Sequence, residues 1–262
     1  MAKSPKILVA IPAYNCEKQI GRVLAGFDKA LLERLEKVVV IDNISTDGTV
    51  AAAQKAATAL KSTKIEVWQN KANYNLGGSH KVAFLAGEKL GMDYVAILHG
   101  DDQAKTQELN RLIDAAVANP DAGAILGCRF MKGSKLVGYN WQRIWGNRAI
   151  NVAFSIVAMR SSRDLGSGLN LFRLQDLADH RYLGFGDTIT FNIDLLLDYF
   201  SKKTILKFVP ITWTEEDQVS NARNFKVGST AIKKLLRWRF SGVELHPQPA
   251  EHYQSGKAKE SK

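Results

Sequence analysis

The first 130 residues alternate short runs of β-type residues with segments whose apolar residues recur at helical spacing. This alternation favours parallel pairing of successive strands, with the helices packed on the faces of the sheet. The sequence therefore predicts an α/β fold with a mostly parallel sheet. The predicted strands cover 7–11, 38–41, 65–68, 94–98, 124–126 and 205–211, and the predicted helices cover about 20–31, 48–60, 79–90, 109–117, 141–159 and 225–240.

Length and composition set the domain organisation. The 262 residues are 45% hydrophobic and 24% charged, which suits one large globular domain or two small ones. We predict a single domain over 1–245, followed by a disordered tail over 246–262, where apolar residues are scarce. Cys16 and Cys128 are too few for a disulfide or zinc framework, so we expect free thiols.

Hydropathy and charge limit the cellular locations and the binding partners that the protein can have. The apolar run Ile7–Ile11 is too short for a signal peptide, and no segment approaches the roughly 20 apolar residues of a membrane span. We therefore predict a cytoplasmic protein. The net charge of +10 indicates an anionic partner, which can be a nucleic acid, a membrane surface or a phosphorylated substrate.

The predicted helix over 225–240 carries part of this charge, because no acidic residue occurs between Asp217 and Glu244. Such a helix can lie peripherally on an anionic bilayer at the inner face of the cell membrane, or it can pack its apolar side on the domain. Both interpretations stay open. The apolar side is Ile232, Leu235, Leu236 and Phe240, and the interleaved basic residues are Lys233, Lys234, Arg237 and Arg239.

Polar residues follow several predicted strands. The segment Tyr94–Gln103 is an apolar run that ends in the adjacent acids Asp101 and Asp102. The carboxyl ends of parallel strands meet at one edge of a sheet, where ligands bind. Adjacent carboxylates at that edge indicate a bound cation or sugar hydroxyls, whereas the simpler alternative is a solvated turn.

Two further segments suit a nucleotide. Asp42 ends the second predicted strand, where its carboxylate can accept hydrogen bonds from a base or a ribose. Asn73–Ser79 precedes a predicted helix, so the backbone N–H groups of Gly77 and Gly78 can face a phosphate.

An ordered set of motifs runs through the chain: Ile11–Asn15 (IPAYN), Val39–Thr49 (VVIDNISTDGT), His99–Gln103 (HGDDQ), Gly127–Phe130 (GCRF), Trp141–Asn151 with Arg143 and Asn147, and Asp164–Arg173 (DLGSGLNLFR). Together they resemble the family 2 glycosyltransferases of GT-A fold. The later motifs are similar to the dolichyl-phosphate mannose synthase branch, which includes bacterial polyprenyl-phosphate glycosyltransferases. The resemblance covers about residues 7–213. It implies a Rossmann-like three-layer α/β/α fold, with a nucleotide-binding half over about 1–130 and an acceptor half over about 131–245.

The resemblance also implies site residues. The implied nucleotide-sugar site comprises Pro12, Tyr14, Asn15, Asp42, Asn43, Gly77, Gly78, Asp101 and Asp102. The implied ligands of Mg²⁺ or Mn²⁺ are Asp101 and Gln103, with His99 or Asp102 as alternatives, since His99 stands where the family usually has Asp. The implied catalytic residues are Asp101, Arg129, Arg143 and Asp187. Hard oxygen ligands suit these cations, and arginines bind phosphate oxygens bidentately.

The nature of the acceptor stays open. The acidic segment Trp213–Asn221 replaces a basic one that the family often has, which weakens the case for a polyprenyl-phosphate acceptor and leaves room for a sugar hydroxyl. A hydroxyl acceptor needs a general base. Asp187 is the first candidate for that base and Asp164 the second, although a structural cap is the more usual role for a residue placed like Asp164.

These features predict an inverting, metal-dependent glycosyltransferase. It would move a sugar from a nucleotide-diphosphate sugar to a polyprenyl-phosphate or glycan acceptor, in the synthesis of cell-envelope polysaccharide or glycolipid. One alternative is a nucleotidyltransferase that makes nucleotide sugars, but Ala13–Cys16 lacks the Gly-rich basic loop that such enzymes carry. The other is a nucleic-acid-binding protein, which rests on charge alone, so no nucleic-acid partner is predicted.

Overall fold

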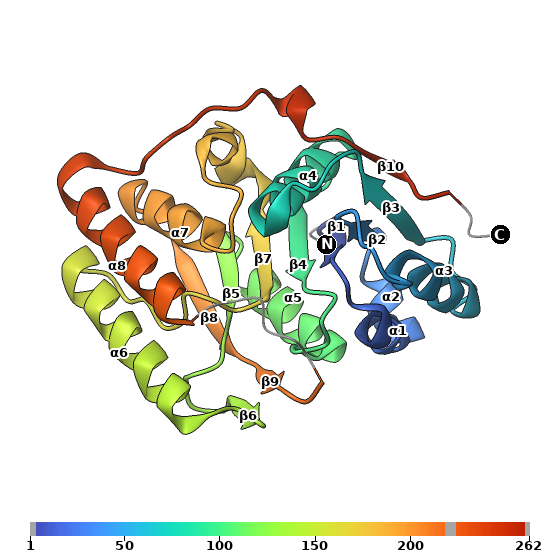
Figure 1. The fold of residues 1–262 in the computed structure, drawn as a ribbon, viewed down its shortest axis with the longest axis horizontal. Helices are drawn as coiled ribbons and strands as arrows, with labels where there is room; N and C mark the ends of the chain where they lie inside the picture. Colours follow the sequence, from blue (N-terminus) through green and yellow to red (C-terminus); the bar gives the residue numbers. More distant parts are fainter. Residues whose placement is uncertain (1–3, 218–223, 260–262) are drawn as a thin grey trace.

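The computed structural model describes residues 4–217 and 224–259, and its main feature is an eight-stranded sheet with helices on both faces (Figure 1). The strands follow the order β10-β3-β2-β1-β4-β7-β5-β8. β7 and β10 run antiparallel to their neighbours, and the other pairs are parallel. The predicted α/β fold with a mostly parallel sheet is therefore confirmed.

The strands of this sheet are β1 (Ile7–Ala13), β2 (Lys37–Asp42), β3 (Ile65–Asn70), β4 (Tyr94–Leu98), β5 (Ala124–Cys128), β7 (Leu169–Arg173), β8 (Leu206–Pro210) and β10 (Ser255–Lys257). A separate pair is formed by β6 (Lys135–Val137) and β9 (Thr212–Thr214). The α-helices are α1 (Glu17–Ala25), α2 (Lys29–Glu33), α3 (Thr49–Ala59), α4 (Asn75–Lys89), α5 (Leu109–Ala118), α6 (Trp141–Ala158), α7 (Phe191–Ser201) and α8 (Asn224–Ser241).

The central strands supply two hydrophobic cores, because successive side chains of a strand point to opposite faces of the sheet. In β1, Leu8 and Ala10 belong to the core formed with α4, α6, α7 and α8. Ile7 and Val9 belong to the core formed with α1, α2, α3 and α5. All four side chains are fully buried. The period-two pattern of the sequence thus produces a three-layer architecture.

The C-terminal segment departs from the prediction of a disordered tail. Residues 255–257 form β10, which pairs with β3 at the edge of the sheet. Tyr253 is buried in the core, and its hydroxyl lies within 2.8 Å of the Lys81 Nζ. The prediction is therefore wrong over 246–259, because one buried aromatic residue and a short strand attach a polar segment. Residues 260–262 lie outside the described residues.

Helix α8 packs on the domain rather than standing apart from it. Ala231 and Leu235 are buried in the core shared with α6 and α7. The Nζ of Lys234 lies 2.7 Å from both carboxylate oxygens of Asp194 in α7. The apolar side packs only in part, because Leu236 and Phe240 keep 48 and 84% of their surface exposed, so the membrane interpretation stays a prediction. No helix in the described ranges is long and apolar enough to cross a bilayer.

Candidate active site

A large cleft opens at the carboxyl ends of β1, β2 and β4, where parallel pairing brings the strand ends to one edge. Its volume is about 1380 Å³, which exceeds what a small ligand needs. The predicted site residues that line it are Pro12, Tyr14, Asn15, Asn43, His99, Asp101, Gln103, Arg129 and Arg143. Those that do not line it are Asp42, Gly77, Gly78, Asp102 and Asp187.

The wall formed after β1 and β2 presents amide and aromatic groups. Asn43 is fixed by three hydrogen bonds: its Nδ2 donates to Asn73, and its Oδ1 accepts from the Tyr74 N–H and from Asn70. Tyr14, by contrast, keeps 42% of its surface exposed. A rigid amide frame beside a free aromatic ring suits a planar heterocycle.

Asp42 lies beneath this wall and not in it. The residue has no exposed surface, and its carboxylate accepts hydrogen bonds from the Ser45 N–H and from the Nε2 of Gln69 at 2.9 Å. The prediction that this carboxylate faces the nucleotide therefore differs from the structure. Asp42 instead closes the turn after β2 and ties it to β3.

Gly77 and Gly78 do not present free N–H groups to a phosphate, so that prediction is wrong. Both lie inside α4, which begins at Asn75. The Gly77 N–H donates to the Asp187 carbonyl at 2.7 Å, and the Gly78 N–H donates to the Tyr74 carbonyl. A Cβ on Gly77 would lie 2.8 Å from the backbone of Asp187. These glycines therefore allow close packing of α4 on the loop that precedes α7.

The acidic centre of the cleft is Asp101. Burial raises the pKa of its carboxyl, while the neighbouring His99 lowers it. The His99 Nε2 is buried without a hydrogen-bond partner among the described residues. The Gln103 Nε2 contacts Glu215 at 3.4 Å. A buried carboxylate beside an unpaired imidazole nitrogen is a donor set that fits a divalent cation.

Asp102 points away from this centre. Its Oδ2 accepts a hydrogen bond from the Arg22 Nε at 2.8 Å, and its Oδ1 lies 3.8 Å from the Lys105 Nζ. The alternative in which Asp102 ligates the metal is thus not supported. Among the described residues, no group of three or more His, Cys, Asp or Glu side chains could hold a metal by itself. Cations of the Mg²⁺ type are commonly held by one or two carboxylates together with substrate phosphates, which this centre can provide.

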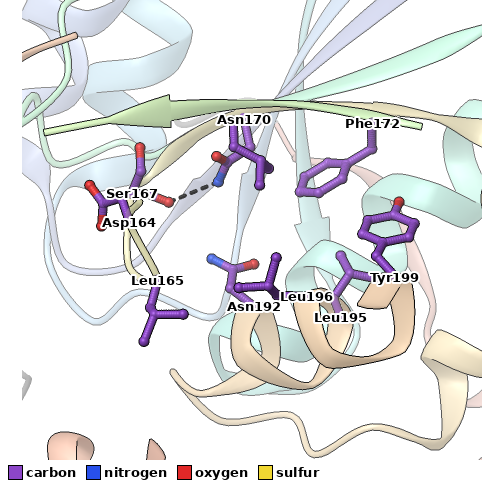
Figure 2. A pocket seen from close by; sticks show the side chains of 10 residues that line it. Asp164, Leu165, Ser167, Asn170, Phe172, Asn192, Leu195, Leu196 and Tyr199 are labelled. Carbon is purple, nitrogen blue, oxygen red and sulfur yellow. Dashed lines mark hydrogen bonds between the residues drawn. The ribbon is translucent and has the colours of Figure 1, made fainter. Parts of the chain in front are cut away.

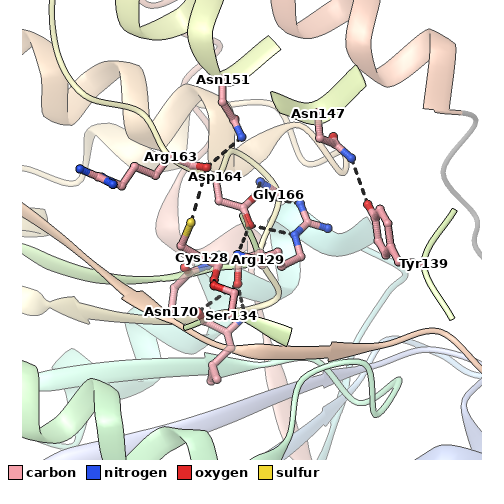
Figure 3. A network of polar contacts seen from close by, with 12 residues as sticks. Cys128, Arg129, Ser134, Tyr139, Asn147, Asn151, Arg163, Asp164, Gly166 and Asn170 are labelled. Carbon is pink, nitrogen blue, oxygen red and sulfur yellow. Dashed lines mark hydrogen bonds and ion pairs between the residues drawn. The ribbon is translucent and has the colours of Figure 1, made fainter. Parts of the chain in front are cut away.

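Arg129 lines the cleft as half of a buried ion pair (Figure 3). Its Nε and Nη2 lie 2.8 and 2.7 Å from the two oxygens of Asp164, whose side chain is 1% exposed. Asp164 also accepts the N–H groups of Arg129 and Gly166. Its oxygens are fully engaged, so Asp164 fits a structural role and not that of a general base. Burial lowers the pKa of Arg129, but Asp164 more than offsets this, so the net pKa is raised.

Arg143 projects from α6 into the same part of the cleft. Its Nη1 lies 2.5 Å from the Glu215 Oε2. The guanidinium groups of Arg143 and Arg129 lie 4.6 and 6.0 Å from the centroid of the Tyr139 ring. Asn147, one turn along α6, donates to the Tyr139 hydroxyl at 3.0 Å (Figure 3). Tyr139 thus brings both predicted arginines to one place.

Asp187 is held outside the cleft. Its Oδ1 lies 2.7 Å from the buried Nζ of Lys81 and accepts a hydrogen bond from the Tyr253 hydroxyl at 2.9 Å. Burial lowers the pKa of Lys81, and Asp187 partly offsets that effect. The prediction of Asp187 as a general base is therefore not supported, because its carboxylate fixes the C-terminal segment to α4.

The cleft residues that the sequence analysis did not assign to the site include Tyr139, Trp213 and Glu215. The structure brings them in through β9, since the Thr214 N–H donates to the Gln103 carbonyl and β9 pairs with β6. The Trp213 ring centroid lies 4.9 Å from the Arg129 guanidinium. Glu215 belongs to the acidic segment 213–221, of which 218–221 lie outside the described residues. Its position shortly after the predicted strand 205–211 was the available signal.

A second, small cavity lies beneath the Arg129 wall (Figure 2). Its volume of about 20 Å³ admits about one water molecule, so it is no substrate site. Asn170 and Asn192 line it, and the Tyr199 hydroxyl has no hydrogen-bond partner among the described residues. Leu165 and Asn192 also line the main cleft, so the cavity adjoins its floor.

The two cysteines are buried and free, as predicted. Burial raises the pKa of Cys16 to about 12 and that of Cys128 to about 11. Although Cys16 lines the cleft, its thiol is therefore a poor nucleophile.

Comparison with known proteins agrees with this geometry. The chain is 24% identical over 242 residues to the polyprenol monophosphomannose synthase of Mycolicibacterium smegmatis, covering 90% of this chain and 88% of that protein. It is 32% identical over 119 residues to the undecaprenyl-phosphate 4-deoxy-4-formamido-L-arabinose transferase of Aeromonas hydrophila, covering 44% and 35%. The resemblance to the polyprenyl-phosphate branch is thus confirmed.

A solved structure shares the fold. Glucosyl-3-phosphoglycerate synthase from Mycobacterium tuberculosis, in complex with Mn²⁺, UDP-glucose and glycerol 3-phosphate, superposes with a TM-score of 0.66 at 14% identity, covering 94% of this chain and 88% of that one. The sequence model described as glycosyl transferase family 2 matches residues 8–180. The chain therefore belongs to glycosyl transferase family 2 and is a glycosyltransferase.

Proposed function

We propose that the protein transfers a sugar, with inversion, from a nucleotide-diphosphate sugar to a polyprenyl phosphate, for the synthesis of cell-envelope polysaccharide or glycolipid. One observation carries this proposal. Asp101 lines the same cleft as Arg129 and Arg143, which gather around Tyr139, and this supports a site for a cation together with a site for a phosphate.

The donor fits the wall that carries Tyr14 and Asn43. The exposed Tyr14 ring gives the base a flat surface, and the fixed Asn43 amide gives a polar contact. Asp101 and His99 would hold a divalent cation, Mg²⁺ or Mn²⁺, beside the diphosphate. When bound, that cation offsets the charge that develops on the departing nucleoside diphosphate. The M. tuberculosis structure with Mn²⁺ and UDP-glucose supports this arrangement by analogy of fold.

The acceptor phosphate fits the arginine group around Tyr139, where Arg143 can bind two of its oxygens. A phosphate oxygen then attacks the anomeric carbon, the bond from that carbon to the diphosphate oxygen breaks, and the nucleoside diphosphate leaves with the electron pair. A single displacement of this kind inverts the anomeric configuration. Because a phosphate oxygen is already anionic, the step needs no general base. This agrees with the ion pairs that Asp187 forms with Lys81 and Asp164 forms with Arg129.

The direct test is a transfer assay on the wild-type protein with Mn²⁺, a set of uridine and guanosine diphosphate sugars, and a short-chain polyprenyl phosphate. We expect one donor to give a glycosyl phospholipid whose anomeric configuration, measured by NMR, is opposite to that of the donor. Retention of configuration, or failure of every donor with the phosphate acceptor while a sugar acceptor reacts, would contradict the proposal.

A sugar hydroxyl is a second candidate acceptor, favoured by the carboxylate of Glu215 in the cleft. Its side chain is 18% exposed and pairs with Arg143, so it stands where a general base could act. The Glu215 carboxylate also forms an ion pair with the Arg143 guanidinium, which the phosphate acceptor would need.

The variant Glu215→Gln separates the two acceptors. With a phosphate acceptor, we expect the KM for the acceptor to fall while kcat is kept, because a competing carboxylate has gone. With a hydroxyl acceptor, loss of the base should lower kcat by about 10²- to 10⁴-fold. Steady-state kinetics with each acceptor class measure this. Glu88→Gln, at an exposed carboxylate that contacts His180, is the control and should behave as wild type.

A further inference from the structure

Helix α6 has two faces with opposite surroundings. One face enters the cleft through Arg143, Asn147 and Ile150. The other face points away from the domain at the edge of the molecule, beside α8 and far from β3 and β10 (Figure 1). One rigid helix thus joins the acceptor side of the cleft to an outer surface.

Large apolar side chains recur along that outer surface, with Arg148 among them over the Trp145 ring. We define the outer stripe as five residues at spacings that keep one side of a helix: Trp141, Trp145, Val152, Ile156 and the C-cap residue Met159. Their exposed fractions are 67, 64, 58, 70 and 80%. Soluble monomers rarely expose so many large apolar side chains on one face unless that face binds something.

The residues around the outer stripe are basic, which favours an anionic partner. No Asp or Glu occurs between Asp121 and Asp164. The basic residues of this segment are Arg129, Lys132, Lys135, Arg143, Arg148, Arg160 and Arg163. Lys132, Lys135, Arg148 and Arg163 are exposed, and none of these four forms an ion pair within the described part of the chain. An anionic surface therefore complements the stripe, whereas a second copy would bring like charges together.

We propose that the outer stripe of α6 lies in the interface of an anionic lipid bilayer. Tryptophan side chains are favoured at that depth, and flanking basic residues remain at the level of the headgroups. The membrane contact is therefore placed on α6, although the sequence directed attention to the more basic α8. Whether the acceptor is a lipid phosphate rests on the proposed function, but the membrane contact itself does not.

The orientation of α6 relates the membrane contact to the binding of a lipid acceptor. With the outer stripe in the headgroup region, Arg143 on the opposite face stays above the membrane plane within the cleft. A lipid acceptor could then keep its chain in the bilayer while its phosphate reaches the arginines. The protein would bind its acceptor without crossing the membrane.

The test is flotation of the full chain with vesicles of phosphatidylcholine and phosphatidylglycerol, or of phosphatidylcholine alone, with neither donor nor acceptor lipid present. We expect binding to the anionic vesicles, with a blue shift of tryptophan emission. Binding should weaken as the Debye length falls from about 10 Å at 0.1 M salt to about 3 Å at 1 M. Trp145→Ser/Ile156→Ser should bind at least about tenfold more weakly, because both apolar anchors are lost.

Matched variants make the test specific. Val117→Ser/Ile205→Ser removes two apolar side chains that are 60 and 49% exposed elsewhere, and it should bind as wild type does. Arg148→Gln/Arg163→Gln should weaken binding and flatten its salt dependence, whereas Lys55→Gln/Lys89→Gln should change neither.

Three results would overturn the proposal. The first is absence of wild-type binding at low salt, and the second is equal binding by Trp145→Ser/Ile156→Ser. The third is a wild-type dimer in sedimentation that this variant converts to a monomer, which would make the outer stripe a contact between subunits. None of these results affects the transfer assay, so failure of the membrane contact and failure of the proposed activity can be told apart.

Discussion

Replacement of Asp101 by Asn is expected to slow sugar transfer by about 10²- to 10³-fold, the usual cost of removing one group that stabilises charge in a transition state. Asp101 is the carboxylate that lines the cleft where we propose that the cation binds. The amide of Asn keeps the shape of the side chain but removes its charge. Affinity for Mn²⁺ in the presence of a nucleoside diphosphate, measured from the EPR signal of free Mn²⁺, should fall together with the rate.

The adjacent residue supplies the control. Asp102→Asn changes the neighbouring carboxylate in the same way, but Asp102 pairs with Arg22 and does not line the cleft. Its backbone has a φ of 57°, which Asn tolerates well. We expect its rate and Mn²⁺ affinity to stay close to those of wild type. Equal losses in both variants would show that Asp101 has no special role at the cation site.

Loss of Asp164 is expected to destabilise the fold by about 3–5 kcal/mol, since it leaves the Arg129 charge buried and unpaired. For a protein of this size the melting temperature should fall by roughly 6–20 °C. Thermal unfolding of Asp164→Ala, followed by circular dichroism, measures this. Glu33→Ala, which removes an exposed partner of Lys29, should change stability by less than about 1 kcal/mol.

A double variant separates stability from function at the same place. Arg129→Met/Asp164→Leu removes both charges and should recover most of the stability lost in Asp164→Ala, because no buried charge remains unpaired. It should nevertheless transfer sugar poorly, since Arg129 lines the cleft. If the double variant were as unstable as the single one, the ion pair would not explain the effect.

The local pattern of the sequence predicts the fold well. Strands such as β1 and β4 are short apolar runs whose neighbouring residues supply opposite cores, and that period is visible without any tertiary information. The motifs likewise identified Asp101, Arg129 and Arg143, which lie in the cleft. Asp101 and Arg129 follow predicted strands, so the topology of the sheet brings them together, whereas Arg143 lies within the predicted helix 141–159 and reaches the cleft from α6.

Contacts between distant segments could not be predicted in this way. Asp42 faces inward because Gln69, on β3, donates to it, and Asp187 is turned away from the cleft by Lys81 and Tyr253. Glu215 reaches Arg143 only because β9 pairs with β6. In each case the sequence offers several partners for a polar side chain. The partner that it contacts depends on the packing of distant segments, which local sequence patterns do not contain.

The pairing of β10 with β3 determines which parts of the sheet are open to other chains. An edge strand presents unpaired N–H and C=O groups, which are a template for association between copies. β10 satisfies those of β3 from Trp68 to Asn70. A chain shortened at residue 245, where the sequence suggested a domain boundary, would expose that edge. The polar C-terminal segment therefore guards the protein against aggregation as well as completing its core.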